Sequence, residues 1–283
     1  MDIKEIRTQR ALSRTQIKLA DFVINPYRGC EFGCKYCYSR ENKNVKKRTE
    51  PWGSFLDVKI DAPFVLEKEL RFKRPKCIML GSTTECFQPR EEEFKVTRAL
   101  LEIIKSRNIP VVILTKSNLI EKYVDLLNYN PNNKIYFTFM FQDKAVKDIL
   151  EKDTPELEKR IKAIKKLIEN KIRVKIHVGP FIPFMEDLRK LFQFIPPGIK
   201  EVEIEVYNSK MGNFKEIVSL IKERISKEKS AALAKTYSSG KDYNNFCTFL
   251  RKEAQKINED YNFKLNFIVP EFDSWYTDKI KYE

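Results

Sequence analysis

The chain has 283 residues, 42% hydrophobic and 12% aromatic, which is enough apolar material to bury a core and excludes a disordered chain. Its length fits one large domain or two small ones and excludes a miniprotein held together by disulfides or a metal. No apolar run approaches the roughly 20 residues needed to span a bilayer, and the charged start of the chain is unlike a signal peptide. We therefore expect a cytoplasmic protein with no membrane partner.

Basic residues outnumber acidic ones by 54 to 40, which gives a net charge of +14. The excess is uneven, because the first fifty residues hold twelve basic and six acidic side chains. A basic balance favours an anionic partner such as nucleic acid, with phosphate contacts expected from Arg7, Arg10, Arg14, Lys46, Lys47 and Arg48. The alternative is a Lys- and Glu-rich protein from a hot environment, in which the charges form surface pairs.

After a basic N-terminal segment at residues 1–20, strand-like and helical patterns alternate. Apolar, β-branched runs lie at residues 22–26, 77–80, 111–114, 135–140, 174–182 and 202–207. Alternating strands and helices predict an α/β fold with a parallel sheet covered by helices. Six such units are two short of the eight-unit barrel. Residues 21–210 are therefore predicted to form an open, partial (βα)6 barrel.

Helices are predicted over residues 94–106, 154–170 and 213–229, with Thr154 as the cap of the second and Pro155 at its first helical position. The charged residues 41–50 are interpreted as a solvated loop. Beyond residue 210 the pattern changes, and residues 211–283 are predicted to form a C-terminal α/β extension packed on the barrel. It would contain a small-residue stretch at 230–240, a helical run at 246–257 and a strand at 265–269.

Alternation within the last two strand-like runs gives each a polar face. Lys175 and His177 share one face of the fifth run, and Glu203 and Glu205 share one face of the sixth. If the apolar faces meet the helices, the polar faces line the barrel and favour a polar substrate; the alternative is an exposed sheet. His177, the only histidine, is interpreted as structural, with a catalytic role as the alternative.

Three of the six cysteines form a CxxxCxxC pattern directly after the first strand-like run: Cys30, Cys34 and Cys37. Three thiolates on one short loop can ligate three irons of a 4Fe–4S cluster, which leaves the fourth iron open to a substrate. The alternatives are a zinc knuckle or an electron-transfer cluster. Both usually need a fourth ligand, and the chain has no second CxxC, although Cys77 or Cys86 could supply one after folding.

The segment Asn25-Pro-Tyr-Arg-Gly-Cys30-Glu-Phe-Gly-Cys34-Lys-Tyr-Cys37-Tyr38 resembles the radical S-adenosylmethionine (radical SAM) superfamily. Its first half resembles the branch related to spore photoproduct lyase, which is described as DNA-repair photolyase-like. The resemblance covers about residues 21–207 and includes Pro51-Trp-Gly53, Gly81-Ser-Thr-Thr-Glu85, Leu114-Thr-Lys-Ser117 and residues 154–160. It implies a lyase-like enzyme with a 4Fe–4S cluster, S-adenosylmethionine and an external electron donor. One electron from the cluster would break the cofactor's C–S bond, and the resulting 5′-deoxyadenosyl radical would take a hydrogen atom from the substrate.

The resemblance also implies roles for single residues. Cys30, Cys34 and Cys37 would hold the cluster, and the cofactor contacts would be Tyr36, Ser82, Thr83, Thr84, Glu85, Lys116, Thr138, Arg160 and Ile182. In this assignment Tyr36 and Ile182 meet adenine, residues 82–85 meet the amino group, and Arg160 meets the carboxylate. The alternatives are an aromatic that braces the loop, a core isoleucine, a polar turn, a helical ion pair of Arg160 with Glu156 and, for Lys116, a solvated surface lysine.

The chain departs from the photoproduct lyases at Ser82. Those enzymes carry a cysteine at the matching position, which returns a hydrogen atom to the repaired base. A serine O–H bond is too strong for that donation, so the substrate stays unidentified. Cys86 is a candidate hydrogen donor, with a buried packing role as its alternative. The competing functions are a radical enzyme acting on a small molecule or peptide, and a non-catalytic iron–sulfur protein that carries electrons or binds nucleic acid.

Overall fold

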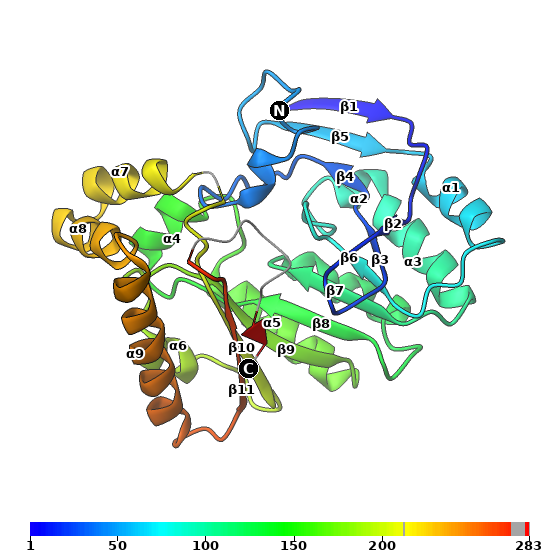
Figure 1. Ribbon diagram of the computed structural model, residues 1–283. Helices are drawn as coiled ribbons and strands as arrows, with labels where there is room; N and C mark the ends of the chain where they lie inside the picture. The colour runs from blue at the N-terminus through cyan, green and yellow to red at the C-terminus, as the bar shows by residue number, and fades with distance from the viewer. Residues whose placement is uncertain (212, 273–280, 283) are drawn as a thin grey trace. The chain divides into compact units, whose positions relative to one another are not determined.

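The computed structural model describes residues 1–211, 213–272, 281 and 282, and these divide into two compact units. The first unit comprises Met1–Gly33, Asn42–Phe137 and Asp153–Val174. The second comprises Cys34–Glu41, Thr138–Lys152 and Lys175–Glu283. Each unit is described separately below, with the element labels of Figure 1.

The first unit is built on parallel strands. The strand order is β8-β7-β6-β3-β2, with β3 (Phe22–Ile24), β6 (Ile78–Leu80), β7 (Val111–Thr115) and β8 (Lys134–Thr138) parallel and the short β2 (Ser13–Arg14) antiparallel. β3 and β6 are buried at every position, as expected for strands covered on both faces. On one face Val23, Met79, Val112 and Tyr136 form a layer that Ile17 and Leu19 help to cover.

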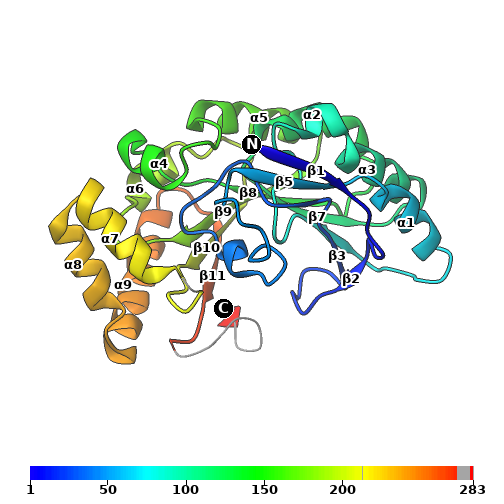
Figure 2. The same ribbon diagram turned by 90° about the horizontal axis from the view of Figure 1, so that it is seen from above.

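Several helices and a small second sheet complete the first unit. The helices are α1 (Ala62–Glu69), α2 (Glu91–Phe94), α3 (Val96–Ser106), α5 (Leu157–Glu169) and the 3-10 helix η2 (Asn118–Leu126), and α1 packs beside α3 (Figure 2). In the second sheet β5 (Phe55–Lys59) lies between β1 (Asp2–Ile6), which is parallel to it, and β4 (Tyr27–Arg28), which is antiparallel. This sheet fixes the segment that leads into the cysteine loop.

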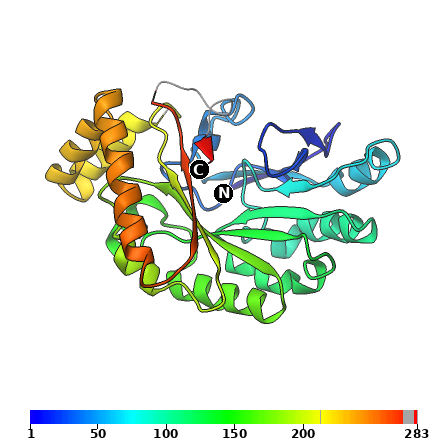
Figure 3. The same ribbon diagram turned by 60° about the horizontal axis from the view of Figure 1, so that its bottom comes forward.

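The second unit also contains parallel strands. β9 (Arg173–Phe181), β10 (Glu201–Val206) and β11 (Lys264–Val269) are parallel neighbours, and β12 (Lys281–Tyr282) pairs antiparallel with β11. The helices are α4 (Lys144–Leu150), α6 (Leu188–Gln193), α7 (Phe214–Arg224), α8 (Lys227–Thr236), α9 (Gly240–Asn258) and the 3-10 helix η1 (Tyr38–Glu41). Helix α9 runs alongside β11 (Figure 3), and α8 packs against both α7 and α9.

The predicted fold class, α/β with parallel strands, is confirmed, and each predicted strand matches an observed one to within two residues at either end. The domain boundaries at residues 20 and 210 stay predictions. Within the described residues no helix is both long and apolar enough to cross a membrane.

Three predicted helices need correction. The helix expected at 94–106 is interrupted at Lys95, whose φ of 51° ends α2 and starts α3. The helix expected from Thr154 begins at Leu157, and Thr154 instead accepts a hydrogen bond from Arg160. The third prediction, 213–229, covers α7 and the first turn of α8, because Ser226 caps a new helix with its side chain.

Candidate functional site

The cysteine loop follows β3 and β4 and depends on glycine at two points. Gly29 has a φ of +90°, and a Cβ there would lie 2.4 Å from the Phe55 carbonyl oxygen. Gly33 has a φ of +52° and crosses Gly53 so closely that a Cβ on Gly53 would lie 2.9 Å from the Gly33 Cα. Only glycine combines this conformation with this approach. The backbone of residues 51–53, a segment included in the family resemblance, therefore packs directly against the cysteine loop.

The three loop cysteines form no disulfide with any residue that the structure describes; Cys30 and Cys34 are buried and Cys37 is partly buried. Backbone hydrogen bonds from Gly33 to Cys30 and from Cys37 to Cys34 make two successive turns in the loop. No group of three or more His, Cys, Asp or Glu side chains among the described residues has the arrangement of a metal site. Ligation by Cys30, Cys34 and Cys37 therefore stays a prediction.

Asn25 ties the start of the loop to the segment after β6. Its Nδ2 donates to Ser82 Oγ at 3.0 Å, and its Oδ1 accepts from the Thr83 amide at 2.9 Å. Thr84 Oγ1 donates to the Gly29 carbonyl at 2.6 Å. Three of the residues predicted to meet the cofactor's amino group thus lie directly beside the loop that carries Cys30. The Thr83 contact is made by its backbone amide, and the Thr84 contact is buried.

Glu85 has a different environment from its neighbours. Its buried carboxylate accepts hydrogen bonds from Thr115 Oγ1 at 2.7 Å, the Lys116 amide at 2.9 Å and the Phe87 amide at 3.0 Å. Burial raises its pKa, which these hydrogen bonds only partly offset. The carboxylate therefore joins the ends of β6 and β7 and holds the backbone of Lys116, whose side chain is partly buried.

The Cys86 thiol is fully buried in the first unit. A Cβ on Gly81 would lie 3.2 Å from its Sγ, and burial raises its pKa well above the ordinary value, with Glu85, Glu91 and Cys30 adding to the effect. This environment disfavours the thiolate and is typical of a packed cysteine. A hydrogen-donor role for Cys86 stays a prediction.

Arg160 is 1% exposed on the first turn of α5. Its guanidinium donates to Thr154 Oγ1 at 2.6 Å and to the Pro155 carbonyl at 2.9 Å. These bonds fix the fork of the guanidinium at the start of the helix, which is the preorganisation that carboxylate recognition requires.

In the second unit, Tyr36 is held on two sides. Its hydroxyl donates to the buried Glu151 carboxylate, and its ring lies against that of Phe141 with centroids 6.2 Å apart. Phe141 has a φ of 57°, and its amide donates to Glu186. Burial raises the pKa of Glu186 to about 8, since backbone donors offset only part of the cost. The aromatic between Cys34 and Cys37 thus has a fixed orientation.

The remaining predicted contacts in the second unit lie on strand ends. Thr138 ends β8 and is 1% exposed, and Ile182 follows β9 and is fully buried. Burial of Ile182 is compatible with core packing, its stated alternative. Hydrogen bonds of the Lys35 backbone also fix the chain next to Tyr36. The Lys35 carbonyl accepts from Asn213 Nδ2 at 2.8 Å, and its amide donates to the Leu150 carbonyl at 2.9 Å.

The polar faces predicted for the last two strand-like runs meet side by side. His177 Nδ1 lies 3.1 Å from Glu203 Oε1, its Nε2 lies 3.2 Å from Glu205 Oε2, and Lys175 pairs with Glu201 at 3.0 Å. Burial alone would lower the pKa of His177, but the hydrogen bonds to Glu203 and Glu205 raise it to about 9. His177 is therefore an imidazolium at neutral pH.

A family model for the radical SAM superfamily matches residues 24–195, which is more than half of the chain. The chain belongs to the radical SAM superfamily. The match begins within β3 and includes every predicted cofactor and cluster residue. Membership makes this radical SAM protein an enzyme of the class that uses S-adenosylmethionine.

Curated relatives of this radical SAM protein come from archaea and bacteria. An uncharacterized protein of Methanocaldococcus jannaschii is 32% identical over 214 residues, which cover 74% of this chain and 79% of that protein. Uncharacterized proteins of Mycobacterium bovis and Mycobacterium tuberculosis are 24% identical over 174 residues, covering 59% of this chain and 51% of theirs.

Solved structures of spore photoproduct lyase share the fold of this radical SAM protein. One, complexed with a dinucleoside spore photoproduct, has a TM-score of 0.66 at 16% identity and covers 94% of this chain and 82% of the lyase. A double mutant of the lyase with bound AdoMet and the same dinucleoside has a TM-score of 0.65 at 15% identity, covering 93% and 80%.

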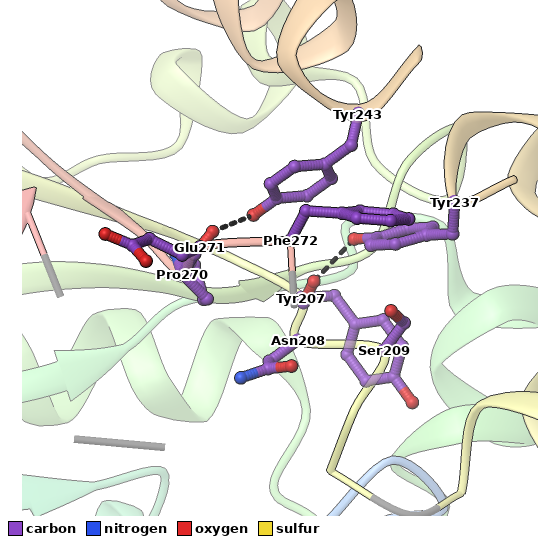
Figure 4. A pocket seen from close by; sticks show the side chains of 8 residues that line it. All are labelled: Tyr207, Asn208, Ser209, Tyr237, Tyr243, Pro270, Glu271 and Phe272. Carbon is purple, nitrogen blue, oxygen red and sulfur yellow. Dashed lines mark hydrogen bonds between the residues drawn. The ribbon is translucent and has the colours of Figure 1, made fainter. Parts of the chain in front are cut away.

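An aromatic depression at the C-terminal ends of β10 and β11 was not anticipated from the sequence. It is shallow, open to solvent and encloses no space for a water molecule, and it is lined by Tyr207, Asn208, Ser209, Tyr237, Tyr243, Pro270, Glu271 and Phe272 (Figure 4). The Tyr237 hydroxyl donates to the Tyr207 carbonyl and that of Tyr243 to the Pro270 carbonyl. The sequence feature that could have indicated this depression is the high density of aromatic residues after residue 206. The alternation of polar and apolar residues, from which the strands were predicted, does not detect it.

Proposed function

We propose that this radical SAM protein binds a 4Fe–4S cluster through Cys30, Cys34 and Cys37 and cleaves S-adenosylmethionine reductively. The supporting observation is the loop itself, which carries three cysteines within eight residues, none in a disulfide with a described residue, and whose backbone approaches Gly53 and Phe55 as only glycines allow. Thiols are the ligands that iron–sulfur clusters require. The donor set therefore fits the cluster.

With both groups bound, the cluster and S-adenosylmethionine would supply a 5′-deoxyadenosyl radical that abstracts a hydrogen atom from the substrate. The chain's own residues would bind and orient the cofactor. Ser82 and Thr83 would meet its amino group, with Asn25 fixing both, and Arg160 and Lys116 would meet its carboxylate. Tyr36, Thr138 and Ile182 would line the adenosine side. Glu85 would act through Lys116, whose backbone it holds.

The substrate is proposed to be a nucleic acid or a nucleotide-like molecule, in a lyase-like reaction in the cytoplasm with an external protein as electron donor. Support comes from the net charge of +14 and from the fold shared with a lyase whose structure holds a dinucleoside. Arg48 does not support phosphate binding, because it pairs with Asp2, Glu50 and Asp57. Arg7, Arg10, Arg14, Lys46 and Lys47 remain exposed.

The test is anaerobic reconstitution with iron and sulfide, reduction, and measurement of 5′-deoxyadenosine. We expect the wild-type chain to form it and a Cys34→Ala chain to form none. Zinc as the purified metal, or an intact cluster that leaves S-adenosylmethionine unbroken, would overturn the proposal in favour of a closed zinc or electron-transfer site.

A further inference from the structure

The His177 cluster in the second unit comprises His177 on β9 and Glu203 and Glu205 on β10. His177 lies opposite Glu203 in the strand register, so the contact follows directly from the pairing of β9 with β10. The contact with Glu205, two residues further along β10, requires the imidazole to lean toward the C-terminal end of the strands. That is the edge at which α/β enzymes bind their substrates.

Gly179 makes this lean possible. A Cβ on Gly179 would lie 2.2 Å from His177 Nε2, so every other residue would displace the ring. The imidazole therefore occupies the space that a side chain at position 179 would fill. Gly179, which lies two residues before the end of β9 at Phe181, therefore permits this orientation of the His177 ring.

The members of the cluster differ in access. The side chains of His177 and Glu203 are 6% and 7% exposed, whereas that of Glu205 is 29% exposed. Because the pKa of His177 is raised to about 9, both ring nitrogens donate at neutral pH, one to each carboxylate. Glu205 is thus held in place by His177 while part of its side chain remains exposed to solvent.

An amide donor lies on the same face. Asn266 on β11 is the register partner of Glu203, and its Nδ2 is buried without a hydrogen-bond partner among the residues that the structure describes. A buried amide N–H without a partner is costly, so this N–H needs an acceptor that the described residues do not supply. Glu205 and Asn266 together present an acceptor and a donor one diagonal step apart on neighbouring strands.

We propose that Glu205 and Asn266 bind the substrate by an amide-like edge that carries adjacent N–H and C=O groups, with His177 as the positioning residue for Glu205. This inference rests on the proposed function, which supplies the reaction that the substrate would enter. Such an edge occurs on a nucleobase and on a carboxamide. Phosphate is excluded as the ligand, because its negative charge is repelled by the Glu205 carboxylate.

The single histidine makes the test direct, because the imidazole Cε1–H signal in an NMR spectrum of the full chain can come only from His177. The probes are uridine, acetamide and inorganic phosphate, each added at millimolar concentration to anaerobically reconstituted protein. We expect uridine or acetamide to shift the signal and phosphate to leave it unchanged. The probe that shifts the His177 signal shows whether the bound edge belongs to a nucleobase or to a carboxamide.

Two variants complete the experiment. Glu205→Gln should lower the pKa of His177 and abolish the probe-induced shift, whereas Glu201→Gln, on the same strand and face but paired with Lys175, should preserve both. The proposal is overturned if neither amide probe shifts the signal, if phosphate acts equally, or if the shift survives in Glu205→Gln. 5′-Deoxyadenosine formed without any probe response would remove this inference alone. A probe response without 5′-deoxyadenosine would remove the proposed function alone.

Discussion

At the scale of single residues, Glu85 shows how one buried carboxylate can organise a binding edge. Its oxygens accept from Thr115, Lys116 and Phe87, so replacing it by glutamine turns an amide nitrogen toward N–H donors. We expect Glu85→Gln to lower the free energy of unfolding by about 1–3 kcal/mol, the usual cost of an unsatisfied buried group. Urea denaturation measures it.

The control for that prediction is Glu92→Gln, which removes an exposed carboxylate paired with Lys122 on the surface. Exposed pairs contribute about 0–1 kcal/mol, so this variant should unfold close to the wild type. Equal losses in the two variants would show that Glu85 is not the junction between β6 and β7.

His177 gives a second residue-scale prediction, on pH. Its pKa rises from 6.5 to about 9 on folding, so its contribution to stability is complete below about pH 6.5 and is lost as the pH rises through 9. The rise in pKa corresponds to a stabilisation on the order of 3 kcal/mol. Thermal unfolding of wild type and His177→Gln from about pH 6 to about pH 10 should show the difference shrinking with pH. A difference independent of pH would mean that the imidazole packs without titrating.

At the scale of elements, the crossing of the cysteine loop over residues 51–53 gives a prediction about cluster assembly. Gly33→Ala places a Cβ 3.2 Å from the Gly53 Cα at a φ of +52°, which disfavours the loop conformation. Iron and sulfide bound per chain after reconstitution should fall severalfold. Gly198→Ala, with a φ of +95° in the turn before β10, is the matched control.

Gly198→Ala should lose stability for the same conformational reason and still bind iron fully, since the cysteine loop is untouched. If both variants lose iron alike, the loss reflects general destabilisation and not the geometry of the loop.

The elements also show what the sequence could and could not predict. β6 and β7 were predictable because covered strands are continuously apolar. β1 was missed, since the charged run Asp2–Ile6 gains its strand conformation only from β5, about fifty residues later. Only the first turn of α8 was predicted, because residues 230–240 were interpreted as a small-residue stretch between two helices, although alanine is the best helix former.

The candidate site, too, could be predicted from the sequence only in part. The CxxxCxxC spacing identified the loop, because ligand chemistry depends on residue type and local spacing. The partners of Tyr36, namely Glu151 and Phe141, could not be predicted, since they lie more than a hundred residues away along the chain. The contact between Lys175 or His177 and the glutamates of β10 was accessible from alternation, but the lean of His177 over Gly179 was not.

At the scale of the whole molecule, the charge of +14 makes a quantitative prediction if the substrate is a nucleic acid. Each phosphate contact adds about 0.7–0.9 to the slope of log K against log salt. Replacing four exposed residues of the N-terminal region by glutamine should lower the magnitude of that slope by up to about 3.6. The four are Arg7, Arg10, Arg14 and Lys47.

The matched control removes the same charge from exposed lysines of α8 and α9, by replacing Lys227, Lys229, Lys235 and Lys241 with glutamine. A general effect of net charge would weaken binding equally in both variants, because long-range attraction depends on total charge. A phosphate-contacting surface would lower the slope only in the N-terminal variant, since only direct contacts release counterions. Gel-shift titrations of a short oligonucleotide at two ionic strengths distinguish these outcomes. If the wild type does not bind at low salt, the charge serves surface pairing instead, and the substrate of the radical reaction has to be sought among small molecules and peptides.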